Sequence, residues 1–347
     1  MPQRDPIEAA ADGSLDLYDV ADWEVRGPLD RLAVAVHASA LTLGRVTIVL
    51  LAVSILVSQF VLGGLGAITD PVVGTVTVLS VVPAVGLAGY VWRADVTSRE
   101  PLSLLVATFL LGVLFAGFAA VINAMFAPAA FVFADVVGVE ALGLLLFFYV
   151  IVGPVEEGVK LLAVRLYAFR DARFDAVVDG AVYGALAGLG FATIENALYI
   201  TQATGDVGMG VFAAGGSVVT VRALAGPGHV IYSAFAGYYL GLAKFNPDQA
   251  GPIVVKGLMI AAFVHATYNA AVSALPSVLA TGLGVSPFLA FVGFVIVYDG
   301  LFGYVLVRKL RTYRQTYHRA RARRSRSFEP DLAEFDPSNR RDRPDSL

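Results

Sequence analysis

The stretch LGLLLFFYVIVGPVEEGVKLLAV, residues 142–164, places two adjacent carboxylates and an ammonium inside a strongly apolar run. Ionised groups in a membrane interior are costly unless they are paired or solvated. Gly153-Pro154 interrupts the run, and a proline there is expected to kink or break the helix. Either Lys160 simply neutralises the glutamates, or the site does chemistry.

The rest of the chain is equally apolar. Of the 347 residues, 57% are hydrophobic, and the mean hydropathy is +0.71. Apolar windows of about 20 residues, enough to cross a bilayer, recur between residues 45 and 308. The composition therefore predicts an all-α, polytopic transmembrane helical bundle. The absence of cysteine excludes disulfides and thiolate chemistry.

The hydropathy pattern predicts about eight spans. They cover residues 45–63, 72–92, 103–127, 140–168, 176–202, 209–243, 252–274 and 286–307. Gly226-Pro227-Gly228 is expected to break the sixth, so that residues 209–225 form a re-entrant or interfacial piece before a span at 227–243.

Loop charge predicts the orientation. Loops that carry Lys or Arg alternate with loops that carry neither, which fits a multi-pass protein of the cell membrane with both termini cytoplasmic. Residues 1–44 read as an acidic segment with an amphipathic lead-in, and residues 45–308 as the transmembrane domain. Residues 309–347 read as a basic, then polar tail that is expected to be disordered. The arginines of the tail suit an anchor to anionic lipid rather than a nucleic-acid site.

Polar groups interrupt four of the predicted spans. Lys160 is an i,i+4 neighbour of Glu156 and an i,i+3 neighbour of Glu157. One lysine neutralises only one glutamate, so a second carboxylate is left over, which suits a general base. Glu195-Asn196 interrupts the next span.

Two histidines continue the pattern. His229 follows the expected break, where the helix dipole favours the neutral imidazole that a base or metal ligand needs. His265 and Asn269 share one helix face and can aim two donors at one point, as an oxyanion hole requires. Each group taken alone also fits a structural hydrogen bond or ion pair. Their convergence on spans four to seven favours a single polar site.

Three further charged residues lie within predicted spans. Asp179 and Arg222 are interpreted as an ion pair lining the same cavity. Asp299 has no evident partner except Lys309 or an arginine nearer the interface.

Four motifs together resemble the PrsW family of intramembrane proteases. They are EEGVK at 156–160, FATIEN at 191–196, GHVIYSAFAGYYLG at 228–241 and HATYN at 265–269, in the family's order. That family is similar to the wider group containing the CAAX prenyl endopeptidases and the bacteriocin-processing enzymes.

The resemblance implies peptide-bond hydrolysis by a protease domain at residues 45–308. Glu156 would activate water, with Glu157 held by Lys160 or another positive group. His265 and Asn269 would polarise the scissile carbonyl and stabilise its oxyanion. The resemblance also implies that Phe191 is a packing residue. The candidate catalytic residues are Glu156, Glu157, Glu195, His229, His265 and Asn269.

Position 195 departs from the wider group. The CAAX enzymes carry a histidine where this chain has Glu195, so their glutamate–histidine base does not transfer to this position. His229 is the candidate to supply the imidazole instead.

Metal dependence stays open between two alternatives. Catalysis by glutamate without a cofactor is favoured, since the HExxH spacing of metalloproteases is absent. The other alternative is Zn²⁺ held by Glu156, Glu195, His229 and His265. The expected partners are the lipid bilayer and a membrane-protein substrate, which the resemblance suggests to be an anti-sigma-factor-like regulator, and no nucleic acid.

Two other functions fit part of the pattern. Buried Glu, His and Lys with broken helices also build the proton relays of ion-coupled transporters, although no internal repeat is evident. A catalytically inactive membrane scaffold is the third possibility, but the intact set of Glu156, His229, His265 and Asn269 argues against it.

Overall fold

The computed structural model describes residues 24–96, 100–204 and 216–327, and within these ranges every regular element is a helix. The all-α prediction is therefore confirmed. The α-helices are α2 (Pro28–Gln59), α3 (Leu65–Thr69), α4 (Pro71–Trp92), α5 (Leu102–Val137), α6 (Glu140–Leu146), α7 (Gly153–Leu166), α8 (Val177–Thr204), α9 (Gly216–Lys244), α10 (Ala250–Leu283) and α11 (Pro287–Ser327). Two π-helical segments, η1 (Phe60–Gly64) and η2 (Phe147–Val152), and two short 3₁₀ turns, η3 (Ala168–Arg170) and η6 (Pro247–Gln249), connect them.

The N-terminal helix α2 is continuous over residues predicted to form a surface lead-in and a first span. The described residues up to Val57 form one unit, and the described residues from Ser58 onward form a second. The second unit contains the helical bundle and all candidate site residues.

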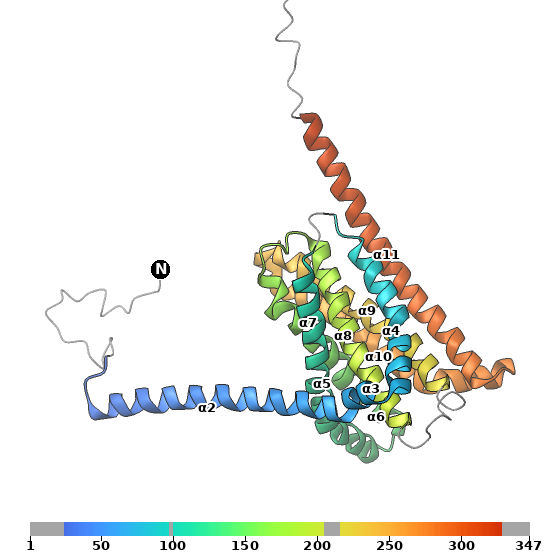
Figure 1. The fold of residues 1–347 in the computed structure, drawn as a ribbon, viewed down its shortest axis with the longest axis horizontal. Helices are drawn as coiled ribbons and strands as arrows, with labels where there is room; N and C mark the ends of the chain where they lie inside the picture. The colour runs from blue at the N-terminus through green and yellow to red at the C-terminus, as the bar shows by residue number, and fades with distance from the viewer. Residues whose placement is uncertain (1–23, 97–99, 205–215, 328–347) are drawn as a thin grey trace, which may run out of the picture. The chain divides into compact units, whose positions relative to one another are not determined.

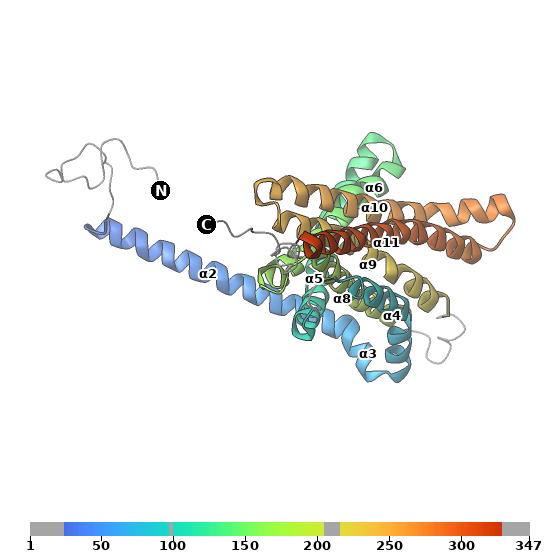
Figure 2. The same cartoon turned by 90° about the horizontal axis from the view of Figure 1, so that it is seen from above.

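Helix α8 lies at the centre of the bundle (Figures 1 and 2), with 83% of its most apolar window buried. It packs against α9, α5, α4 and α7. Glycines allow the close approach to α9: a Cβ at Gly184 would lie 2.2 Å from the Ser233 carbonyl oxygen, and one at Gly237 only 2.0 Å from that of Gly180. The tight packing expected of small residues in membrane helices is present here.

The interruption at Gly153-Pro154 separates two helix types. The π-helical η2 ends at Val152, and α7 begins at Gly153 with Pro154 in its first turn. The backbone stays helical through this junction, because Val152 and Gly153 are both in the right-handed helical region and the Gly153 N–H bonds to the Phe148 carbonyl oxygen. The expected break is therefore absent, and a π-helical irregularity, a feature common at functional sites, precedes the two glutamates.

The predicted break at Gly226-Pro227-Gly228 is wrong. Helix α9 runs without interruption from Gly216 to Lys244 with Pro227 inside it. A proline within a helix costs about 3 kcal/mol, and the packing of α9 between α8 and α10 outweighs that cost. His229 therefore lies in the middle of a helix rather than near its N-terminus, and its neutral form must have another cause. Residues 209–215 of the proposed re-entrant piece lie outside the described residues.

Seven of the described helices are long and apolar enough to cross a membrane, so this is a multi-pass membrane protein. Helix α9 corresponds to the sixth predicted span but falls outside this group. It is rich in glycine and carries Arg222 and His229, which its burial among α4, α8 and α10 accommodates. Figure 2 shows α10 and α11 side by side.

Candidate active site

The two glutamates and the lysine lie in the first turns of α7, and all three are buried. A Cβ added to Gly153 would lie 2.6 Å from the carbonyl oxygen of Ala262, so this glycine brings α7 close to α10. The approach places the glutamates beside His265, on the next turn of α10.

Glu157 has both oxygens engaged. Its Oε1 accepts from Lys160 Nζ at 2.7 Å and lies 3.0 Å from His265 Nδ1. Its Oε2 accepts from the Ser233 hydroxyl at 3.1 Å. A carboxylate can only accept hydrogen bonds, so His265 donates from Nδ1. Glu157 therefore orients the imidazole, as carboxylates commonly do for functional histidines.

Glu156 is less completely engaged. Asn123 donates to its Oε1 at 3.2 Å. Its Oε2 is buried, and no group in the described chain forms a hydrogen bond with it. Lys160 Nζ lies 3.7 Å and His265 Nε2 3.8 Å from this oxygen. The free oxygen thus faces the histidine across a gap wider than a direct hydrogen bond.

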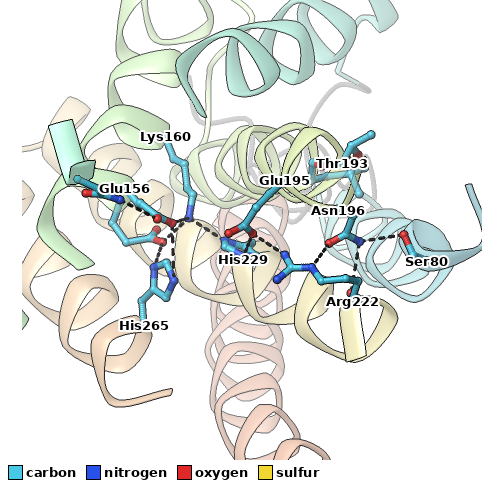
Figure 3. Close-up of polar contacts among 12 residues, drawn as sticks. Ser80, Glu156, Lys160, Thr193, Glu195, Asn196, Arg222, His229 and His265 are labelled. Carbon is cyan, nitrogen blue, oxygen red and sulfur yellow. Dashed lines mark hydrogen bonds and ion pairs between the residues drawn. The ribbon is translucent and has the colours of Figure 1, made fainter. Parts of the chain in front are cut away.

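His229 is held from both sides (Figure 3). Its Nδ1 lies 2.9 Å from Lys160 Nζ, and its Nε2 lies 2.9 Å from Glu195 Oε2. An ammonium only donates, so Nδ1 accepts and the ring proton of the neutral imidazole lies on Nε2. The contact with the Lys160 ammonium, rather than a helix dipole, therefore favours the neutral imidazole.

Arg222 extends the network to the neighbouring helices. It donates to Glu195 Oε2 at 2.6 Å and to Asn196 Oδ1 at 2.8 Å, and Asn196 in turn donates to Ser80 Oγ at 3.0 Å (Figure 3). The predicted pair of Arg222 with Asp179 is wrong, because Arg222 neutralises Glu195 instead. Asp179 accepts hydrogen bonds from backbone amides at the start of α8.

Phe191 packs against the charged groups, as the resemblance implied. Lys160 Nζ lies 4.1 Å from the centre of its ring, and the ring stacks on His229 at 5.4 Å. The aromatic face gives the buried ammonium a favourable electrostatic contact.

A cavity of about 730 Å³ opens beside these groups. Five of the six candidate catalytic residues line it: Glu156, Glu195, His229, His265 and Asn269. Glu157 does not line the cavity, but it contacts Lys160 and His265. The structure thus brings the sequence candidates together around one volume, although the role of each residue stays a prediction.

Sequence reasoning assigned no role to three contributors, namely Asn123, Ser233 and Tyr232. Asn123 is a lone amide in an apolar helix, a signal that could have identified it. Ser233 and Tyr232 lie one helical turn beyond His229 inside a quoted motif. Their contacts cross to other helices, so no spacing along the chain reveals them.

Comparisons with known proteins identify the family of this chain. The model of a family described as "PrsW family intramembrane metalloprotease" matches residues 100–301, more than half of the chain. The chain belongs to this family. Membership of this family makes it an intramembrane protease. Its substrates are therefore membrane proteins. No solved structure matches the chain.

Three curated relatives, each named Protease PrsW, illustrate the similarity. The Bacillus subtilis protein is 30% identical over 197 residues, covering 56% of this chain and 81% of the relative. The Clostridioides difficile protein is 29% identical over 195 residues, with coverages of 55% and 76%. The Shouchella clausii protein is 28% identical over 187 residues, with coverages of 54% and 78%.

The family description raises the question of a metal. Glu156, His229 and His265 each offer a ligand atom, and these atoms all lie within 4.8 Å of one another. A carboxylate with two imidazoles is a donor set that catalytic zinc accepts. Glu195, the fourth ligand proposed from the sequence, lies outside this group and pairs with Arg222.

The bonding of His229 does not fit a metal. Both of its ring nitrogens are already used, one by Lys160 and one by Glu195. The Lys160 ammonium also lies close to the carboxylates that would face the ion. A metal at this group would require the Lys160–His229 contact to break.

Proposed function

We propose that this protein is an endopeptidase that hydrolyses peptide bonds of membrane-associated proteins with water activated by Glu156. One observation carries the proposal. Glu156 Oε2 is buried at the cavity wall without a hydrogen-bond partner among the described residues and lies 3.8 Å from His265 Nε2. A water molecule between the two atoms satisfies both of them.

The water loses a proton to Glu156 as its oxygen bonds to the carbonyl carbon. Glu156 then returns that proton to the leaving amine as the carbon–nitrogen bond breaks. Asn123 holds the other oxygen of the carboxylate, which keeps Oε2 turned toward the cavity.

The oxyanion is assigned to His265 and Asn269. Both line the cavity from one face of α10. His265 and the Asn269 amide are then the two donors for the developing negative charge.

The remaining candidates position these groups. Glu157 holds Lys160 and His265, while Lys160 separates the charges of the two glutamates. Glu195, neutralised by Arg222, holds His229. His229 lines the cavity beside Lys160 and is not required to transfer a proton.

Metal catalysis is the second candidate mechanism, favoured by the three ligand atoms of Glu156, His229 and His265. When bound, zinc would activate the water in place of the carboxylate. The engaged nitrogens of His229 count against it, so no step above depends on a metal.

Partners and orientation follow from the predicted topology. We propose a location in the cell membrane with both termini cytoplasmic, and an anti-sigma-factor-like regulator as one substrate to test. A transporter would also use a polar cavity, but the free carboxylate oxygen facing an oriented histidine suits hydrolysis better than ion passage.

The test uses the full chain in detergent micelles with a panel of tagged single-span membrane proteins, including anti-sigma factors. Cleavage in ¹⁸O-labelled water should place ¹⁸O in the new carboxyl terminus, as mass spectrometry detects. Bound metal is quantified in the same preparation, with and without chelator. Hydrolysis at the same rate with and without chelator supports the Glu156 mechanism. Stoichiometric bound zinc together with loss of cleavage in chelator would instead support the metal mechanism.

A further inference from the structure

Asp299 is a buried carboxyl group in the middle of α11, and it does not line the cavity. The sequence offered only Lys309 or an arginine as its partner, and that interpretation is wrong. The Tyr232 hydroxyl on α9 donates to Asp299 Oδ1 at 2.9 Å. A carboxyl group in a membrane helix is costly to retain, so the contact calls for an explanation.

Tyr232 connects Asp299 to the active site. Its side chain is only 1% exposed, and its ring lies 5.3 Å from the His265 ring with an interplanar angle of 31°. The ring of Tyr232 thus packs against the His265 imidazole, while its hydroxyl is fixed by the hydrogen bond to Asp299. Any rotation of the phenol ring shifts the surface on which His265 rests.

Gly228 leaves room for this arrangement. A Cβ at Gly228 would lie 2.8 Å from the Tyr232 hydroxyl oxygen and 3.0 Å from the ring carbon that bears it. A residue with a side chain would push the hydroxyl away from Asp299. The glycine that looked like a helix breaker therefore serves the packing of Tyr232.

Helix α11 also holds the backbone next to His265. Tyr298, the neighbour of Asp299, donates its hydroxyl to the Val264 carbonyl oxygen at 2.7 Å. Two adjacent residues of α11 thus fix the ring beside His265 and the peptide that precedes it.

We propose that Asp299 is a positioning residue for the reaction, which holds Tyr232 so that its ring fixes the orientation of His265 toward Glu156. The proposal rests on the proposed function. It assigns no contact between Asp299 and substrate, and it explains why α11 keeps an acid at this depth.

The experiment is a double-mutant cycle read out as kcat and KM of the full chain in detergent, with Tyr232→Phe, Asp299→Leu and both together. Each single change should lower kcat roughly tenfold with KM unchanged, the size typical of supporting contacts. The double variant should match Tyr232→Phe alone, because Asp299 acts only through the hydroxyl. If the fold-loss of kcat in the double variant equals the product of the two single losses, the proposal is overturned.

A conservative variant separates positioning from folding. Asp299→Asn keeps an oxygen that accepts from Tyr232, so it should retain at least half of the wild-type kcat. Asp135→Asn, an exposed aspartate near the end of α5, is the matched control. If Asp299→Asn loses as much kcat as Asp299→Leu, the hydrogen bond is not the cause.

Thermal unfolding of each variant is measured in parallel, so a variant that fails to fold is recognised. If wild type cleaves no member of the panel, the proposed function fails. If wild type cleaves but the cycle is additive, only the positioning role fails.

Discussion

Two clusters of carboxyl groups are compared among the described residues of this bundle, and they differ in what surrounds them. Glu156 and Glu157 face Lys160, His229 and His265 beside the cavity. The other cluster combines Asp95, Glu100 and Asp179, which offer oxygen atoms within 4.8 Å of one another. None of these three residues lines the cavity.

Both clusters contain buried carboxylate oxygens without hydrogen-bond partners in the described chain, namely those of Glu156, Glu100 and Asp179. An unpaired oxygen alone therefore does not mark an active site. The second cluster is bonded to structural groups, because Tyr183 donates to Glu100 and Asp179 accepts from the Asp175 and Ala176 amides. Histidines and access to the cavity distinguish the first.

Among the residues that assist Glu156, the largest effect is expected at His265. His265→Ala removes an oxyanion donor and should lower kcat about a thousandfold, at the upper end for one donor. Steady-state cleavage assays measure the loss, and His318→Ala, exposed on α11, is the control. If His265→Ala retains more than about a tenth of the wild-type kcat, His265 is not an oxyanion donor, since loss of one such donor costs at least about a hundredfold.

Glu157 should matter less than His265, because it acts through other residues. Glu157→Gln keeps the size but weakens the hold on Lys160 and His265, so kcat should fall roughly 10- to 100-fold. Ser233→Ala removes a single donor to Glu157 and should cost less. The assignment fails if Ser233→Ala costs more than Glu157→Gln.

The second cluster should affect stability rather than cleavage. Glu100 lies outside the membrane-spanning segments, and desolvation raises its pKa from 4.5 to about 8. Between these values the folded state keeps a proton that the unfolded state has released, so stability falls as pH rises. Above about pH 8 both states are ionised, and the loss is complete.

Glu100→Gln removes this titration. As the pH is raised from 4.5 to about 8, the Tm of the variant should fall less than that of wild type. Scanning calorimetry measures both Tm values. Parallel Tm curves would show that Glu100 does not titrate in this range. The cleavage rate at neutral pH should stay within about twofold of wild type, since supporting effects on catalysis are larger.

The smallest effect is expected at Asp171. Its carboxylate pairs with Arg173 at 2.8 Å, and that hydrogen-bonded partner holds the pKa of Asp171 well below its usual range. The pair is exposed to solvent, where ion pairs contribute little. Asp171→Asn should leave Tm and kcat unchanged, and a clear loss of either would reveal a role beyond the surface pair.

The sequence predicted the helices well, because apolar composition over about 20 residues is a local property. It failed at Pro227, where packing of α9 between its neighbours overrides the local helix-breaking tendency. The predicted break at Pro154 is likewise absent, since the chain stays helical from Glu140 to Leu166, and only a π-helical stretch before Gly153 marks the position.

The sequence predicted that the candidate residues converge, but it did not predict the contacts between them. Glu156, His229, His265 and Asn269 share the cavity as expected. The partners of Arg222 and Asp299 could not be inferred, because Glu195 and Tyr232 lie on other helices whose rotations are set by packing. The sequence likewise could not tell which glutamate keeps a free oxygen, since that depends on Asn123 and Ser233.

The most direct test of the account compares the two clusters in one assay. Glu156→Gln and Glu100→Gln are purified alongside wild type, and the cleavage rate of the same membrane-protein substrate is measured for all three. We predict that Glu156→Gln loses activity by a factor of about 10²–10⁴, the range for removal of a general base, while Glu100→Gln cleaves like wild type. Cleavage by Glu156→Gln at the wild-type rate would contradict the central claim.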